Sequence, residues 1–135
     1  MIHFSLAYWC VLAAAVLPIV CAGIAKSGRF VPLSEGGYDN RSPRDWLAQH
    51  TQWRGRANAA QANAFEAFPF FAVGVIVASL APVSAERIAL LSVIYVLARL
   101  VYIYCYISDR PAWRSMVWGL AMACAIALYG LAIAA

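Results

Sequence analysis

Four long apolar blocks, separated by short polar segments, dominate the pattern of this chain. They run over residues 6–25, 57–83, 88–107 and 115–135. Each block reaches the roughly 20 residues that a helix needs to cross the hydrocarbon core of a bilayer. Because backbone groups in lipid must bond within their own segment, such blocks favour helices over open sheets. The pattern predicts an all-α integral membrane protein, a bundle of four transmembrane helices at about residues 4–25, 55–82, 86–107 and 113–134.

The composition supports a membrane protein of one domain. Hydrophobic residues make up 64% of the 135 residues and charged residues only 12%, whereas about a quarter of a soluble domain is charged. The first block lacks a basic segment before it and is long for the apolar core of a signal peptide. We therefore expect it to remain as a helix of the mature protein.

Cations concentrate on one side of the predicted bundle. Most of the cations lie in two segments. One is the segment between the first two helices, with a polar loop at about 26–54, and the other joins the last two helices. The cations are Lys26, Arg29, Arg41, Arg44, Arg54, Arg56, Arg110 and Arg114. The opposite side has Arg87 beside Glu86. The positive-inside rule predicts that these two segments are cytoplasmic and that both termini lie outside.

Nucleic-acid and metal binding are not expected. No basic run is interleaved with aromatic residues, and the cations are spread over two loops. The four cysteines show no CxxC pair and no Cys/His cluster, and they fall in or near the apolar helices: Cys10, Cys21, Cys105 and Cys124. We expect them to be small buried side chains rather than metal ligands.

The polar loop contains a second helical pattern. Ser42 is a plausible N-cap, Pro43 suits the first helical position and Asp45 suits the first turn. A helix that starts here could continue into the second span. The loop is either a solvated connector with interfacial tryptophans, or a segment in which Arg41 or Arg44 closes the mouth of a site.

Three polar residues share one side of the second predicted helix. Arg56, Asn63 and Glu66 are separated by seven and three residues, which brings them near one another at about 100° of rotation per residue. A glutamate within a membrane costs roughly 2.5–3.5 kcal/mol on insertion scales, so we take a functional role for Glu66 as the default hypothesis.

A second polar stripe lies on the third helix, at the same end of the bundle. Arg99 is flanked at helical spacing by Tyr95, Tyr102 and Tyr106, and Arg114 and Ser115 open the last helix. Two interpretations stay open. Glu66 and Arg99 could be a buried pair that fixes helix packing beside an aromatic belt. Alternatively, the surplus arginines could form a site for an anionic ligand with carboxylates.

At these residues the chain resembles the MAPEG family, the membrane-associated proteins of eicosanoid and glutathione metabolism. The resemblance rests on three motifs in register and covers essentially the whole chain: Arg56-Ala57 with Asn63, Glu66, Pro69 and Phe70; Ala98-Arg99 with Tyr102 and Tyr106; and Arg110 to Ser115. The loop from Tyr38 to Arg44 is similar to that of the bacterial branch, which implies the bacterial inner membrane.

The resemblance implies a MAPEG-like homotrimer that binds glutathione as co-substrate at subunit interfaces on the cytoplasmic side. Arg56, Asn63 and Glu66 would contact glutathione, and Arg99, Tyr102 and Tyr106 would line the pocket. Arg114 would stabilise the thiolate, with Ser115 or the hydroxyl of a tyrosine such as Tyr102 as a further catalytic donor. The expected activity is that of a glutathione transferase or peroxidase, acting on hydrophobic electrophiles or lipid hydroperoxides delivered from the membrane lipid.

The chain also departs from the family at three positions. Ala59, Ala62 and Ala67 stand where eicosanoid-making members carry an arginine, an arginine and a tyrosine, respectively. This argues against a specific eicosanoid synthase. A non-catalytic lipid-binding or scaffold protein is therefore the alternative. A small multidrug-type transporter that uses Glu66 is a third interpretation, although the nearby arginines would repel a cationic substrate.

Overall fold

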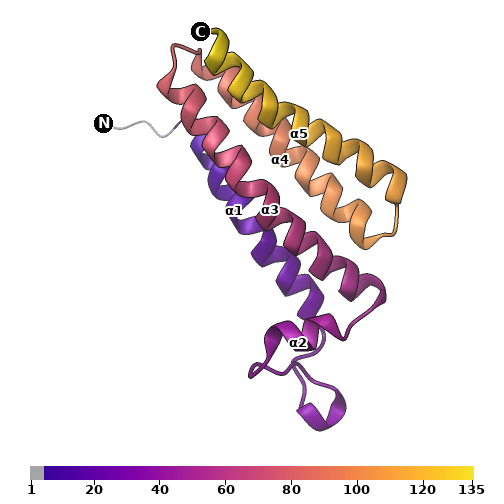
Figure 1. Ribbon diagram of the computed structural model, residues 1–135. Helices are drawn as coiled ribbons and strands as arrows, with labels where there is room; N and C mark the ends of the chain where they lie inside the picture. Colours follow the sequence, from indigo (N-terminus) through magenta and orange to yellow (C-terminus); the bar gives the residue numbers. More distant parts are fainter. Residues whose placement is uncertain (1–4) are drawn as a thin grey trace.

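Four long helices form most of the protein (Figure 1). The computed structural model describes residues 5–135, and its elements are α1 (Leu6–Lys26), the 3-10 turn η1 (Leu33–Glu35), α2 (Pro43–Ala48), α3 (Gln52–Leu80), α4 (Ala85–Ile107) and α5 (Pro111–Ala134). Helices α1, α3, α4 and α5 are each long and apolar enough to cross a membrane. The described residues contain no strand. The prediction of an all-α, four-helix membrane fold is confirmed.

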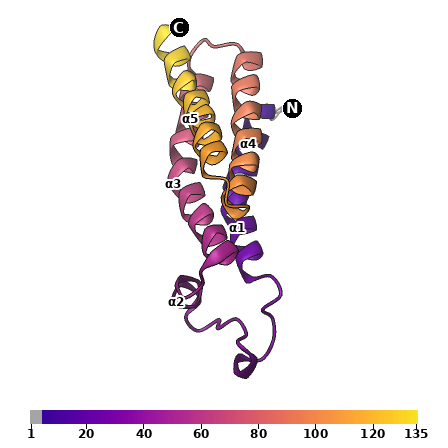
Figure 2. The ribbon, with the colours of Figure 1, turned by 90° about the vertical axis from the view of Figure 1, so that its right-hand side faces the viewer.

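The helices alternate in direction, so each end of the bundle collects specific termini (Figures 1 and 2). Helices α1 and α4 end where α3 and α5 begin, and the loop with α2 extends from this end, which we call the α2 end. The C-terminus lies at the opposite end. Helices α3 and α4 pack against each other, and each also packs against both α1 and α5.

Small residues on α3 allow this close packing. Ala57, Ala60 and Ala64 are buried at a spacing of three and four residues, and the same face continues through Phe71. In lipid, small side chains let helix backbones approach closely. The ring of Phe71 stacks on Tyr95 of α4, with centroids 3.8 Å apart and planes 5° from parallel. This face of α3 forms the centre of the bundle.

The observed helix boundaries lie within three residues of the expected ones wherever the structure describes them. The expected start of the first helix at about residue 4 lies outside the described residues, and α1 begins at Leu6. Helix α3 begins at Gln52, earlier than the expected residue 55. The possible continuation of the loop helix into the second span is not seen, because α2 ends at Ala48 and Gln52 has a positive φ of 56°. Pro43 does occupy the start of α2, as expected.

The loop folds around Trp46. This side chain is buried, its indole Nε1 donates a 3.0 Å hydrogen bond to the Gly37 carbonyl oxygen, and its ring meets Tyr38 edge to face. The loop therefore has a small core of its own, next to the end of α1 and the start of α3.

Gly37→Ala is expected to disrupt this small core. A Cβ at position 37 would collide with the backbone carbonyl oxygens of Val31 and Pro32, and overpacking of this kind typically costs about 1–3 kcal/mol. Limited trypsin digestion should cut the loop faster in the variant than in the wild type. Gly23→Ala is the control, since no atom lies within 4 Å of its added Cβ. Equal loop cleavage in the wild type and Gly37→Ala would contradict the prediction.

Candidate functional site

An open groove at the α2 end is lined by side chains from three helices. Its volume is about 220 Å³, and it is lined by Asn63 of α3, Tyr102 and Tyr106 of α4, and Arg114, Ser115 and Trp118 of α5. Residues four apart lie on one helix face, which explains how Tyr102 joins Tyr106 and Arg114 joins Trp118. We call this cavity the polar groove.

The polar groove carries positive charge and no carboxylate in its lining. The Arg114 guanidinium lies 4.5 Å from the centre of the Tyr106 ring, and the rings of Tyr102 and Tyr106 meet edge to face at 5.6 Å. The buried Oδ1 of Asn63 has no hydrogen-bond donor. The groove therefore offers a cation, several hydroxyl groups and a free amide acceptor to a ligand that is anionic and has N–H donors.

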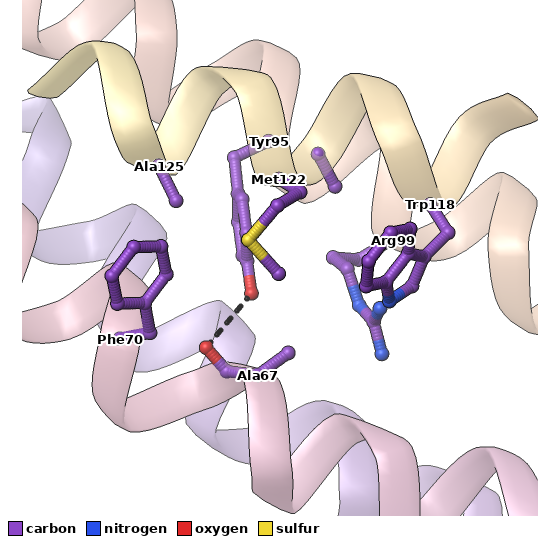
Figure 3. Close-up of a pocket in the computed structure, with 8 residues that line it drawn as sticks. Ala67, Phe70, Tyr95, Arg99, Trp118, Met122 and Ala125 are labelled. Atoms are coloured by element: carbon purple, nitrogen blue, oxygen red, sulfur yellow. Dashed lines mark hydrogen bonds between the residues drawn. The ribbon is translucent and has the colours of Figure 1, made fainter.

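A small pit adjoins the polar groove and holds Arg99 (Figure 3). Its volume is only about 10 Å³, and its lining is otherwise mostly apolar: Ala67, Phe70, Tyr95, Trp118, Ala121, Met122 and Ala125. Arg99 is only 2% exposed, and its guanidinium lies 4.3 Å from the centre of the Tyr102 ring. Its buried Nη2 has no hydrogen-bond partner. Trp118 lines both cavities and so forms the wall between them.

The structure brings together five of the predicted site residues. The polar groove contains Asn63, Tyr102, Tyr106, Arg114 and Ser115, and Arg99 lies in the adjoining pit. Arg56 and Glu66 do not line either cavity.

One of the two open interpretations, a buried pair of Glu66 and Arg99, is not seen within one chain. Glu66 is exposed, and within residues 5–135 the ion pair that forms joins Arg56 to Asp109. The reason is the rotation of α3. Ala64 lies on its buried face, and Glu66 follows two residues later, about 200° around the helix.

Arg56 contacts the connection between α4 and α5 instead of the groove. Its Nε donates a 3.0 Å hydrogen bond to the carbonyl oxygen of Ile107, and its Nη1 lies 3.9 Å from Oδ2 of Asp109. Asp109 was not expected from the sequence, because its contact depends on the geometry of the turn. Trp118 was also missed, although its spacing of four residues from Arg114 was a usable signal.

The loop arginines lie away from the polar groove. Arg44 lines a separate open cavity of about 290 Å³ with Leu47, Asn58, Gln61, Ala62 and Phe65. The backbone amide of Arg41 donates to the Asp39 side chain 2.9 Å away. The interpretation that Arg41 or Arg44 closes the mouth of the site has no support from these contacts.

Four membrane-length helices define a multi-pass helical membrane protein, and a cation-lined groove lies at one end of its bundle. The chain belongs to the MAPEG family, whose sequence model matches residues 6–134. Comparisons with curated proteins and with solved structures gave no significant match. Membership supports a glutathione-related function in a membrane at the level of the family, with the apolar helix faces in contact with lipid.

Proposed function

We propose that this protein is a glutathione-dependent membrane transferase or peroxidase that acts on hydrophobic electrophiles or lipid hydroperoxides. The observation that carries the proposal is the composition of the polar groove. Arg114, Ser115 and Tyr102 line it together with Asn63, whose buried oxygen lacks a donor.

The chemistry of these residues fits glutathione, which carries two carboxylates, one ammonium group, two amides and a thiol. Arg114 and the buried Arg99, whose Nη2 lacks a hydrogen-bond partner, are candidates for its anionic groups, and Asn63 Oδ1 can accept from an N–H. Tyr106 would line the groove beside them. The exposed carboxylate of Glu66 is a candidate for the ammonium group. Both orphaned atoms, on Asn63 and Arg99, would gain partners.

Arg114 is the residue that we assign to activation of the thiol. A thiol is mostly protonated at neutral pH, and only the thiolate is a good nucleophile. A cation close to the sulfur favours the charged form and lowers the thiol pKa. Ser115 and Tyr102 can add a hydroxyl donor. In the transferase reaction the glutathione sulfur would bond to the electrophilic carbon, which releases its leaving group or takes up a proton after addition. In the peroxidase reaction two glutathiones would reduce a hydroperoxide to an alcohol and water and would be oxidised to glutathione disulfide.

We further propose a homotrimer in the bacterial inner membrane, with the α2 end cytoplasmic. The excess of Lys and Arg at that end supports this orientation. The exposed Glu66 is available to a neighbouring subunit, which would complete the site.

Replacing Arg114 tests the proposal directly. Calorimetry on detergent-purified protein should show saturable glutathione binding, and ultraviolet absorbance should follow the thiolate as pH rises. In Arg114→Ala the thiol pKa should rise by about 1–3 units relative to the wild-type complex, because one nearby opposite charge is lost.

Arg110→Ala is the matched control, since that guanidinium lies 5.9 Å from the ring of Tyr104 and does not line the groove. Absence of saturable glutathione binding would exclude the proposed function. Normal binding with an unchanged thiol pKa in Arg114→Ala would exclude the role of Arg114 alone.

The second candidate function is non-catalytic lipid binding. One feature favours it, namely Ala59, which stands where eicosanoid-making members carry an arginine, so that the groove has fewer cations for glutathione. Saturable binding of lipid, together with no saturable binding of glutathione, would support this alternative.

A further inference from the structure

Two arginines at the start of α3 cap the ends of two other helices. Nη1 of Arg54 donates a 2.7 Å hydrogen bond to the carbonyl oxygen of Ala25, near the end of α1. Nε of Arg56 donates at 3.0 Å to the carbonyl oxygen of Ile107, the last residue of α4. The last carbonyls of a helix lack intrahelical donors and form the negative end of its dipole. Each arginine therefore ties α3 to a different helix.

The contact of Arg56 extends into the turn between α4 and α5. Its Nη1 approaches the Asp109 carboxylate at 3.9 Å. Asp109 has a φ of +59°, a left-handed conformation that is uncommon for residues other than glycine, although aspartate tolerates it. Arg56 thus contacts the turn on both sides of Ser108, at a point where the backbone has an unusual conformation.

This turn leads directly to Arg114. Helix α5 begins at Pro111, and its first backbone bond runs from the Arg114 amide to the Arg110 carbonyl at 2.9 Å. The amide of Arg110 in turn donates to Cys105 of α4 at 2.8 Å. The position of the Arg114 side chain over the Tyr106 ring therefore depends on the geometry of the turn.

We infer that Arg56 is a positioning residue for Arg114, acting through Ile107 and Asp109, and is not a ligand of glutathione. This inference rests on the proposed function, because Arg114 is the group that would act on the thiol. It also gives Asp109 a role as the acidic partner of Arg56. The two residues that Arg56 contacts, Ile107 and Asp109, both lie outside the lining of the polar groove.

Amide hydrogen exchange in the ligand-free protein tests the structural step. The variants are Arg56→Gln, Asp109→Asn and the double variant, with Arg54→Gln as matched control. We expect Arg56→Gln to speed exchange at the amides of Arg110 and Arg114 by about three- to tenfold, as the loss of one hydrogen bond allows. Asp109→Asn should give a smaller effect, and the double variant should not exceed Arg56→Gln. Arg54→Gln should leave both amides unchanged.

Glutathione titration tests the functional step. A positioning role predicts that Arg56→Gln raises the bound thiol pKa. The glutathione Kd, measured at a pH below that pKa where the thiol is protonated, should stay within about twofold, since no ligand contact is lost. Arg56→Lys should partly restore the thiol pKa, because an ammonium group keeps the charge but cannot make both contacts. Asp109→Asn should shift the thiol pKa in the same direction as Arg56→Gln.

Several outcomes would overturn the inference. Unchanged exchange at Arg110 and Arg114 in Arg56→Gln would show that Arg56 does not hold the turn. A glutathione Kd at least tenfold weaker in Arg56→Gln but normal in Asp109→Asn would show that Arg56 binds the ligand directly. If the wild type binds no glutathione, the proposed function fails on that result, and the exchange measurements alone decide whether Arg56 holds the turn.

Discussion

Arg99→Met is expected to make the ligand-free protein more stable while weakening glutathione binding at least tenfold. Arg99 is 2% exposed, and within residues 5–135 it forms no ion pair. Burial of a cation without an anionic partner has a large desolvation cost. Replacing buried charges by apolar side chains often stabilises proteins by about 1–4 kcal/mol. Loss of the contact with the Tyr102 ring offsets part of this gain, by about 0.5–2 kcal/mol.

Thermal unfolding in detergent, with and without glutathione, measures both effects. The melting temperature of Arg99→Met should exceed that of the wild type without ligand, and glutathione should raise it less. Arg99→Lys is the control, because it keeps a buried charge and should not gain stability. A lower melting temperature for ligand-free Arg99→Met than for Arg99→Lys would contradict the prediction. It would show that the charge of Arg99 is already stabilised by groups of the protein and does not need a bound anion.

The four spans were predictable because the membrane imposes their length and their internal hydrogen bonding. Two interruptions, Glu66 and Arg99, did not obscure them, since one charge in about 20 apolar residues leaves the block intact. The groove was predictable in part for a similar reason. Tyr102 with Tyr106, and Arg114 with Ser115, are close enough in sequence for helical geometry alone to place them together.

The rotation of each helix was harder to predict. In lipid the outer face of a helix is as apolar as its buried face, so the pattern of polarity does not show which side faces the bundle. The small residues Ala57, Ala60 and Ala64 carried that information for α3. Their face excludes Glu66 from the interior, which is why Glu66 does not pair with Arg99 within one chain.

The partners of Arg56 depended on a feature that sequence spacing does not contain. Its contacts lie 51 residues away at Ile107, and in a turn where Asp109 takes a left-handed conformation. No helical periodicity links these positions. The turn between α4 and α5 brings Asp109 to the start of α3 because these three helix ends meet at the α2 end.

Phe71→Ala is expected to cause the largest loss of stability among these variants, about 3–5 kcal/mol. Phe71 is fully buried and lies flat against Tyr95, whose hydroxyl donates to the Ala67 carbonyl of α3 at 3.4 Å. Removal of the ring leaves a cavity between α3 and α4 that rigid helices cannot close.

The neighbouring Phe70 provides a matched control for this prediction. Its ring stacks on Tyr129 of α5 at 5.0 Å, but the residue is 39% exposed, so Phe70→Ala should cost clearly less. Denaturation of both variants in the same detergent compares them directly. Equal losses would contradict the prediction and would mean that contact with an aromatic partner, and not burial at the centre of the bundle, determines the contribution of each ring. A larger loss for Phe71→Ala locates the packing centre between α3 and α4, close to the Arg99 pit that Tyr95 also lines.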